Sequence, residues 1–318
     1  MSASPASVAS LAQRIRGNIE HVIVGKSEVI DLALVALLAD GHLLIEDVPG
    51  IGKTMLAKAL ARSLGCAFRR LQCTPDLLPA DVTGIHYFNQ KTQEFEFRPG
   101  PVFTNILLAD EINRATPRTQ AALLECMEER QVTLETGTVP LSRPFMVIAT
   151  QNPVELQGTF PLPEAQLDRF LMQLPIGYPG ANEEAAILQR FRTANPLDDL
   201  EPVAVADEVV QMQRAVREIH VSQTVEGYIV EITRATRSHP EIELGASPRA
   251  SLGLHRAAQA LAAIRHRTFV LPDDVKPLVP YVLPHRLITT SQARLRERGA
   301  REIAQEIVKS VPVPVETE

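Results

Sequence analysis

The sequence predicts an α/β fold in which a parallel five-stranded sheet, covered by helices, is followed by a smaller all-helical domain. Two observations carry this prediction. Between residues 43 and 174, short apolar runs alternate with helical patterns, which is typical of a parallel sheet with crossover helices. After Pro179-Gly180 the helical patterns continue, and no apolar run of comparable strand character follows. We therefore expect two domains, residues 1–180 and residues 181–318, as the chain length of 318 residues also suggests.

The expected elements follow in order. Apolar residues at helical spacing predict a helix over residues 8–22, and an all-apolar run predicts a buried helix over residues 29–39. The expected strands are residues 43–45, 68–71, 106–109, 145–149 and 170–174, with a helix after the first strand up to about residue 64. The expected helices of the second domain are residues 182–196, 206–220, 224–238, 247–266 and 272–282. Asn182 is the expected N-cap of the first of these, and Ser247-Pro248 predicts an N-cap followed by a first-turn proline.

Composition excludes several classes of protein. With 45% hydrophobic and 22% charged residues, the chain has enough apolar surface to fold. The longest apolar stretch, Leu32 to Ala39, is much shorter than the roughly 20 residues of a membrane span. No basic and apolar leader is visible at the N-terminus, so we expect a cytoplasmic protein without membrane insertion. The net charge of −6 argues against a protein that coats nucleic acid, although it allows a small basic channel.

The strongest motif is a glycine-rich loop between the first strand and the next helix. Glycines allow a backbone to curl so that its N–H groups point at phosphate oxygens, a lysine reaches those oxygens, and a hydroxyl holds Mg²⁺. The nucleotide-binding candidates are Pro49, Gly50, Ile51, Gly52, Lys53, Thr54 and Met55. Asp47 stands where the general pattern G-x-x-x-x-G-K-[ST] has its first glycine. The alternative is a chance turn before a helix.

A second motif places two carboxylates directly after a buried strand. The apolar run over residues 106–109 leads into Asp110 and Glu111, and ligands in open α/β sheets bind at the carboxyl ends of the strands. We expect Asp110, together with Thr54, to hold Mg²⁺. Glu111 is then placed to polarise the attacking water. The alternative is a solvated acidic turn after the strand.

Three further polar residues are candidates for phosphate chemistry. Asn152 follows the strand predicted over residues 145–149 and could hold the lytic water or the γ-phosphate, or it could simply start an Asn-Pro turn. Arg169 and Arg249 carry guanidinium groups that suit the charge of a transferring phosphoryl group. The alternatives are an ion pair of Arg169 with Asp168 or Glu164, and a solvated first-turn position for Arg249.

Taken together, the motifs resemble the MoxR family of AAA+ ATPases over about residues 8–310. The resemblance rests on EDVPGIGKT (46–54), DEINRA (110–115), ATQNP (149–153), EAQLDRF (164–170) and GASPRA (245–250). It implies an AAA+ P-loop core with a helical lid, and a family that tolerates Asp47. The implied roles are Walker A for Lys53 and Thr54, Walker B for Asp110 and Glu111, sensor 1 for Asn152, arginine finger for Arg169, sensor 2 for Arg249, an adenine-lining segment at Val24-Gly25 and an inter-subunit contact at Arg114.

The resemblance also implies an assembly and partners. Residues 83–101 resemble the helix-2 insert of this clade, and residues 131–143 resemble a second hairpin; in related rings such hairpins face the central pore, although both could be ordinary surface hairpins. The implied activity is Mg²⁺-dependent ATP hydrolysis in a homo-oligomer, with a hexamer expected. The implied clients are proteins with von Willebrand factor A domains, remodelled as a chaperone would. A nucleic-acid-dependent motor of the same clade and a non-hydrolysing nucleotide sensor are the alternatives.

Overall fold

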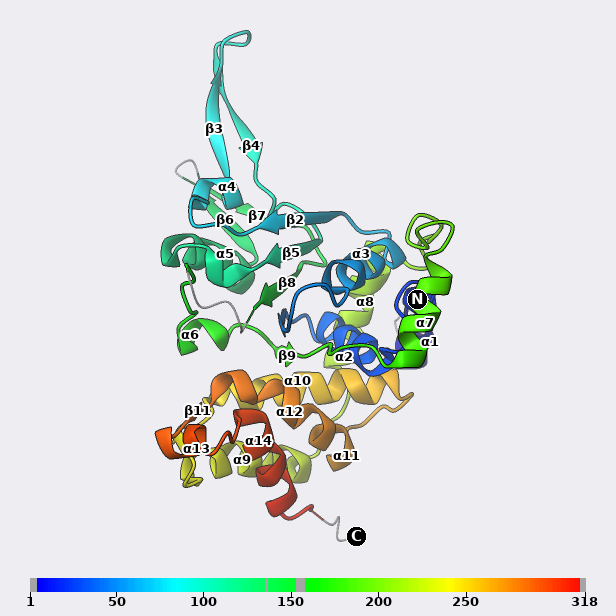
Figure 1. Cartoon of the computed structure of the whole chain (residues 1–318), viewed down its shortest axis with the longest axis vertical. Coiled ribbons are helices and arrows are strands. Elements are labelled where there is room, and N and C mark those ends of the chain that lie inside the picture. Colours follow the sequence, from blue (N-terminus) through cyan, green and yellow to red (C-terminus); the bar gives the residue numbers. More distant parts are fainter. Residues whose placement is uncertain (1–4, 135–136, 153–157, 315–318) are drawn as a thin grey trace.

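A central parallel sheet organises the protein. The computed structural model describes residues 5–134, 137–152 and 158–314. Its five-stranded sheet has the order β2-β5-β8-β1-β9, with every neighbouring pair parallel (Figure 1). The strands are β1 (Leu43–Glu46), β2 (Phe68–Gln72), β5 (Ile106–Asp110), β8 (Met146–Gln151) and β9 (Met172–Leu174). These match the five expected strands, so the predicted parallel α/β core is confirmed.

Helices cover both faces of the sheet because side chains of a strand alternate between its faces. Leu43 and Ile45 of β1 join one apolar core, and Leu44 between them joins the other. The first core contains the apolar faces of α1 (Pro5–Glu20), α2 (Ser27–Leu38) and α3 (Lys53–Ser63). The second core contains α5 (Pro117–Glu129), which follows the short turn η1 (Ile112–Arg114). The near-continuous apolar run of β1 therefore reflects burial on both sides.

Two hairpins lie outside the sheet. After the short helix α4 (Pro79–Thr83), strands β3 (Gly84–Asn89) and β4 (Glu94–Pro99) pair antiparallel and project far from the body of the molecule (Figure 1). Strands β6 (Gln131–Leu134) and β7 (Gly137–Pro140) form the second hairpin. Hairpins were expected at both places, although residues 135–136 of the second lie outside the described residues.

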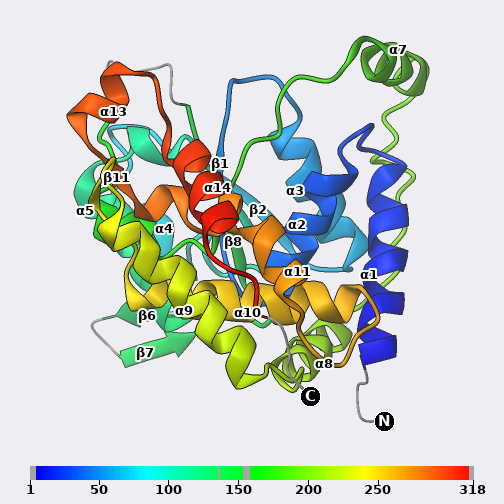
Figure 2. The same ribbon diagram turned by 90° about the horizontal axis from the view of Figure 1, so that it is seen from below.

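The second half of the chain is mainly helical. Its elements are α6 (Glu164–Leu167), α7 (Ala181–Arg190), α8 (Ala206–Arg217), α9 (Gln223–Ser238), β10 (Ile242–Leu244), α10 (Pro248–Ile264), α11 (Pro272–Val275), η2 (Lys276–Leu278), α12 (Val279–Val282), η3 (Pro284–Arg286), β11 (Ile288–Thr289), α13 (Ser291–Leu295) and α14 (Ala300–Ser310). The helices α9 to α14 pack together beyond β9 (Figures 1 and 2). Among the described helices, none is both long and apolar enough to cross a membrane.

Local details of this half differ from the sequence prediction. The N-cap of α7 is Gly180, not Asn182, because the side chain of Glu183 accepts a hydrogen bond from the Gly180 amide at 2.8 Å. The helix expected over residues 272–282 is broken into three short pieces, since Pro277 and Pro280 cannot donate the backbone hydrogen bonds of a continuous helix. A short antiparallel pair, β10 with β11, was not expected. The cap of α10 is as expected: the Ser247 hydroxyl accepts from the Arg249 amide at 3.2 Å.

The helix α8 bears on the domain division proposed near residue 180. Although it follows that point, α8 packs against the N-terminal helices: Gln213 donates to the carbonyl of Leu37 at 2.7 Å, and Arg14 pairs with Glu208 at 2.5 Å. Helix α10 also crosses α1 and α2 (Figure 2). The division into residues 1–180 and 181–318 therefore remains a proposal, with an extensive contact between the two parts.

Two buried histidines connect separate segments of the fold. His42, just before β1, accepts a hydrogen bond on Nδ1 from the Val147 amide at 2.9 Å, so its Nε2 donates to the Met127 carbonyl at 3.0 Å. His285 of η3 bonds the Phe170 carbonyl through Nε2 at 2.9 Å. Burial lowers the pKa of both imidazoles well below the ordinary value of 6.5. Both side chains are therefore neutral in the folded protein near pH 7.

These pKa shifts predict a loss of stability in mild acid. Below pH 6.5 the unfolded chain binds protons on both imidazoles while the folded chain does not, so the free energy of unfolding falls as the pH falls. Each histidine contributes up to about 1.4 kcal/mol per pH unit in this range. Denaturant unfolding of wild type and His42→Gln between pH 7.5 and 5.5 measures the effect. The variant should show the shallower pH dependence, and equal slopes would contradict the assignment of a neutral His42.

Candidate functional site

A polar cavity lies at the carboxyl ends of the central strands, where the loop after β1 meets β5 and β8. It encloses about 320 Å³. Its lining residues are Pro49, Gly50, Gly52, Lys53, Thr54, Met55, Arg70, Gln72, Asp110, Glu111, Thr150 and Asn152. We call it the loop cavity. The structure thus brings together the glycine-rich loop, both carboxylates and Asn152, which the sequence predicted as separate motifs.

The loop presents its backbone and one lysine to this cavity. Gly50 and Gly52 have φ values of +87° and +94°, which L side chains rarely adopt, so glycine is required for the turn. Lys53 is the first residue of α3, whose unpaired N-terminal N–H groups suit an oxyanion. Its Nζ donates to the carbonyl of Asp47 at 2.6 Å. Burial lowers the pKa of Lys53, and the charges of Asp47, Asp110 and Glu111 oppose that shift.

Asp47 explains the departure from the general loop pattern. Its carboxylate accepts hydrogen bonds from the amides of Val48 at 2.8 Å, Ile176 at 2.8 Å and Gly177 at 2.6 Å. A glycine at this position could make none of these side-chain contacts. Asp47 therefore ties the start of the loop to the chain segment that leaves β9.

The two carboxylates are held by residues of the neighbouring strands. Asp110 Oδ1 accepts from the Thr150 hydroxyl at 2.6 Å, and Oδ2 accepts from Arg70 at 2.6 Å and 3.1 Å. Glu111, in the left-handed region with φ of +57°, accepts from Gln72 at 3.0 Å. These contacts orient both carboxylates toward the cavity.

Arg114 and three further residues surround the two carboxylates. Arg114 lies in η1 and pairs with Glu111 at 3.5 Å. Sequence analysis missed Arg70, Gln72 and Thr150. They are near the carboxylates because β2 and β8 flank β5, with Gln72 in register with Asp110. The order of the strands, which the sequence does not state, would have been needed to find them.

The oxygen donors of the loop cavity fit Mg²⁺. The Thr54 hydroxyl and the Asp110 carboxylate line the same cavity, and hard oxygen ligands supplemented by water and phosphate oxygens are what Mg²⁺ prefers. No softer nitrogen or sulfur ligand is among the residues predicted to hold the metal. The donor set therefore agrees with the predicted metal role of Thr54 and Asp110.

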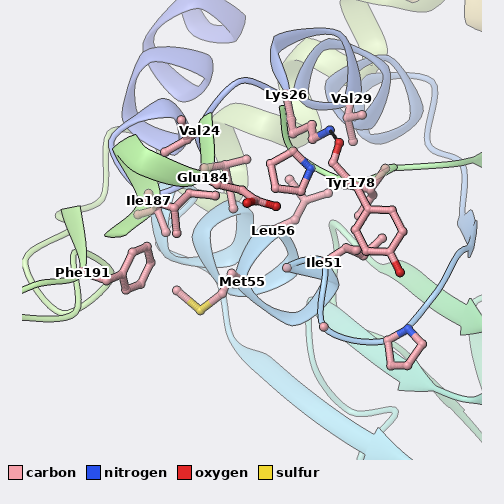
Figure 3. A pocket seen from close by; sticks show the side chains of 17 residues that line it. Val24, Lys26, Val29, Ile51, Met55, Leu56, Tyr178, Glu184, Ile187 and Phe191 are labelled. Atoms are coloured by element: carbon pink, nitrogen blue, oxygen red, sulfur yellow. Dashed lines mark hydrogen bonds between the residues drawn. The ribbon is translucent and has the colours of Figure 1, made fainter. Parts of the chain in front are cut away.

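A second, mainly apolar cavity of about 480 Å³ adjoins the loop cavity, and Figure 3 shows the side chains that line it. Pro49, Gly50, Gly52 and Met55 line both cavities. The other lining residues are Val22, Ile23, Val24, Lys26, Val29, Ile51, Leu56, Ile176, Tyr178, Pro179, Glu184, Ile187 and Phe191. Its volume and apolar walls suit a purine base, and its position would leave the phosphates of a nucleotide in the loop cavity.

The predicted adenine-lining pair is divided in this structure. Val24 lines the apolar cavity, whereas Gly25 does not. Gly25 instead has φ of +71°, and a Cβ built on it would lie 1.9 Å from the Glu183 side chain of α7. The glycine therefore allows the segment after α1 to pack closely against α7, whose residues Glu184 and Ile187 line the cavity.

Arg169 and Arg249 lie together in a third cavity of about 430 Å³, which we call the arginine cavity. Both contact Glu128 of α5: the Arg249 guanidinium at 2.6 Å and Arg169 Nε at 3.9 Å. The alternative for Arg169 was an ion pair with Asp168 or Glu164. Among the described residues, Arg169 instead pairs with Glu128, and Asp168 pairs with Arg286 at 2.6 Å.

The arginine cavity lies at the amino ends of the strands, and the loop cavity lies at their carboxyl ends. The arginine cavity is lined by residues 39–42, just before β1, and by Leu171, just before β9. The loop cavity is lined by residues at the ends of β2, β5 and β8. Strands of four to six residues at about 3.3 Å per residue separate the two ends by roughly 13–20 Å. One chain therefore does not bring Arg169 or Arg249 to its own glycine-rich loop.

Comparison with known proteins identifies the family of this chain. The model of the "ATPase family associated with various cellular activities (AAA)" matches residues 42–172, and the model of the AAA lid domain matches residues 234–308. The protein Chaperone MoxR1 of Mycobacterium tuberculosis is 40% identical over 93% of this chain and 80% of its own length. This chain belongs to the MoxR family of AAA+ ATPases. The protein YeaC of Bacillus subtilis is 52% identical over 94% of this chain and 93% of its own length.

A solved structure has the same fold over nearly the whole chain. A crystal structure of a protein from Cytophaga hutchinsonii superposes with a TM-score of 0.91 at 36% sequence identity, covering 98% of this chain and 97% of the other. The core and the helical lid are therefore arranged alike in the two proteins. The expected AAA+ core with a lid is confirmed, whereas the roles of individual site residues remain predictions.

The contacts of Asp47 predict a role in nucleotide binding. Asp47→Asn removes the negative charge that accepts hydrogen bonds from three backbone amides, and hydrogen bonds to charged groups contribute about 1.5–3 kcal/mol each. We expect about tenfold weaker binding of ATP, because the loop and the cavity wall at Ile176 are no longer held together. Titration with a fluorescent ATP analogue measures the affinity. Asp199→Asn, at an exposed aspartate, is the matched control, and an unchanged affinity for Asp47→Asn would contradict this role.

Proposed function

We propose that this protein hydrolyses ATP with Mg²⁺ at the boundary between neighbouring copies of a ring, expected to contain six, and uses the energy to remodel protein partners. One observation carries the proposal: the residues suited to phosphoryl transfer are divided between two cavities, one at the carboxyl ends of the strands and one at their amino ends. If the carboxyl ends of the strands of one copy faced the amino ends of the strands of the next, the loop cavity of the first would meet the arginine cavity of the second. Membership of the AAA+ ATPases supports the same arrangement.

Within one chain, the residues of the loop cavity would bind ATP and activate water. Lys53 and the loop amides would bind the phosphates, and Thr54 and Asp110 would hold Mg²⁺, which would neutralise phosphate charge. Glu111 would accept a proton as the water oxygen attacks the γ-phosphorus and the bond to the β–γ bridging oxygen breaks, giving ADP and phosphate. Asn152 would orient the water or the γ-phosphate from the end of β8.

The neighbouring chain would complete the site. Arg169 and Arg249 would approach the γ-phosphate from the adjacent copy and stabilise the charge that spreads over its oxygens. Arg114 would contact the neighbouring copy, and its ion pair with Glu111 would link the position of that copy to Glu111. Hydrolysis would then depend on the relative position of two copies, which couples the reaction to movement in the ring.

A protein client is the partner that the chain supports best. The projecting β3–β4 hairpin exposes aromatic side chains, including Phe88 at 51% and Phe95 at 74%, and a relative is named a chaperone. The net charge of −6 gives no general attraction to nucleic acid. We propose that the hairpins contact the client at the pore, that clients include proteins with von Willebrand factor A domains, and that the protein acts in the cytoplasm.

The division of the site predicts the effect of removing Arg169. Arg169→Ala should lower the kcat for ATP hydrolysis about 10³-fold, since an arginine supplied in trans contributes roughly 10³–10⁵ in related phosphoryl transfer. Binding of ATP should change little, because the loop cavity stays intact. A steady-state phosphate-release assay together with nucleotide titration measures both quantities. Wild-type turnover would refute the assignment.

Mixed assemblies test whether the arginine acts across the interface. Glu111→Gln should bind ATP without turnover, while keeping Arg169 and Arg249. Mixed with Arg169→Ala, it should restore part of the activity that both variants lack alone, because each new interface joins an intact loop cavity to an intact arginine cavity. Activity that stays absent at every mixing ratio would exclude a site shared between copies.

A further inference from the structure

The two arginines of the arginine cavity share one acidic partner. Glu128 lies in the last turn of α5, with Oε1 2.6 Å from the Arg249 guanidinium and Oε2 3.9 Å from Arg169 Nε. Arg169 follows α6 in the core, whereas Arg249 lies in the first turn of α10, 80 positions later in the chain. A single carboxylate from a third element thus contacts two residues that reach the cavity from different parts of the chain.

Separate contacts already fix the backbone beneath both arginines. The Asp168 carboxylate accepts from Arg286 Nε at 2.6 Å and from the Ser247 hydroxyl at 3.0 Å. The Arg286 side chain is only 3% exposed and also donates to the Phe170 carbonyl at 2.7 Å. Because Ser247 also caps α10 through the amide of Arg249, the two arginine-bearing segments are joined directly. The freedom that remains lies in the long side chains of Arg169 and Arg249.

Glu128 restricts the rotamers that the side chains of Arg169 and Arg249 can adopt. The side chains of Arg169 and Arg249 are 31% and 45% exposed, so without a partner they would sample many rotamers. Two guanidinium groups in one cavity also repel each other, and the carboxylate between them reduces this repulsion. A guanidinium carries five N–H donors in a fixed fork. One carboxylate therefore cannot use all the donors of two arginines, and others can reach a phosphate.

We infer that Glu128 is a positioning residue that holds Arg169 and Arg249 ready for the phosphates of ATP bound to the neighbouring copy. This inference rests on the proposed function, since it requires both arginines to act on ATP across an interface. Glu128 itself touches no nucleotide in this arrangement. Its effect is therefore confined to the rate of hydrolysis at the neighbouring site and leaves the nucleotide affinity of its own chain unchanged.

The variant Glu128→Gln tests the inference. It keeps the side-chain volume and removes the charge, and a misplacement of about 1 Å at a reacting centre can lower a rate about 100-fold. We expect kcat to fall about 10- to 100-fold, with unchanged KM for ATP, unchanged affinity for a fluorescent ATP analogue and an unchanged melting temperature. The matched control is Glu129→Gln, at the adjacent exposed glutamate. A kcat equal to or above that of wild type, or a changed KM alone, would overturn the inference.

Mixing separates a positioning role from a general structural one. Combined with Glu111→Gln, the Glu128→Gln chain should regain turnover, because its intact loop cavity then meets an intact arginine cavity. Absence of any recovery would overturn the inference. The single variant Arg169→Ala keeps the two proposals distinct: if it turns over as wild type does, the proposed function fails. If Arg169→Ala is inactive and Glu128→Gln is fully active, only the role of Glu128 fails.

Discussion

The placement of β5 between β2 and β8 is the constraint on which the candidate site depends. The parallel register sets Gln72 beside Asp110 and leads β8 to Thr150 at the same edge. Thr150 then donates to the Asp110 carboxylate and accepts from the Glu111 amide. Since β1 pairs with β8 on the other side, the glycine-rich loop emerges at this edge too. The order and register of the strands therefore bring the carboxylates, the loop and their partner residues to the same ends of the strands, where Thr150 and Gln72 contact Asp110 and Glu111.

The same sheet explains why Arg169 and Arg249 lie away from the loop cavity. The segment before β9 and the C-terminal end of α5 both lie at the amino edge of the strands, where residues 39–42 line the arginine cavity. Helix α10 reaches this edge through the contacts of Ser247 and Arg249. A rigid sheet of this kind holds the two groups of residues apart at a fixed separation. In the proposed assembly, a complete site would form only between two copies, and hydrolysis would then depend on how the copies are arranged.

How much the sequence predicted depends on how local each feature is. The loop around Lys53, the pair Asp110 and Glu111, and the five strands were predicted because each is a continuous pattern of a few residues. Arg70, Gln72 and Glu128 were missed because their importance arises only from neighbours in space. The prediction of Asn182 as the N-cap of α7 was wrong, because Asn182 and Gly180 are both acceptable N-cap residues. The Glu183 side chain, by bonding the Gly180 amide, decided between them.

Asp47 shows how a departure from a general pattern can carry structural information. A glycine at this position would allow the loop to turn, but it would leave the loop unconnected to the segment after β9. The carboxylate of Asp47 bonds Ile176 and Gly177, and Ile176 and Tyr178 line the apolar cavity. The backbone carbonyl of the same residue accepts from Lys53. Asp47 thus joins the wall of the proposed base pocket to Lys53, the proposed phosphate-binding lysine. A shift of the chain that leaves β9 would therefore change the position of Lys53 at the proposed phosphate site.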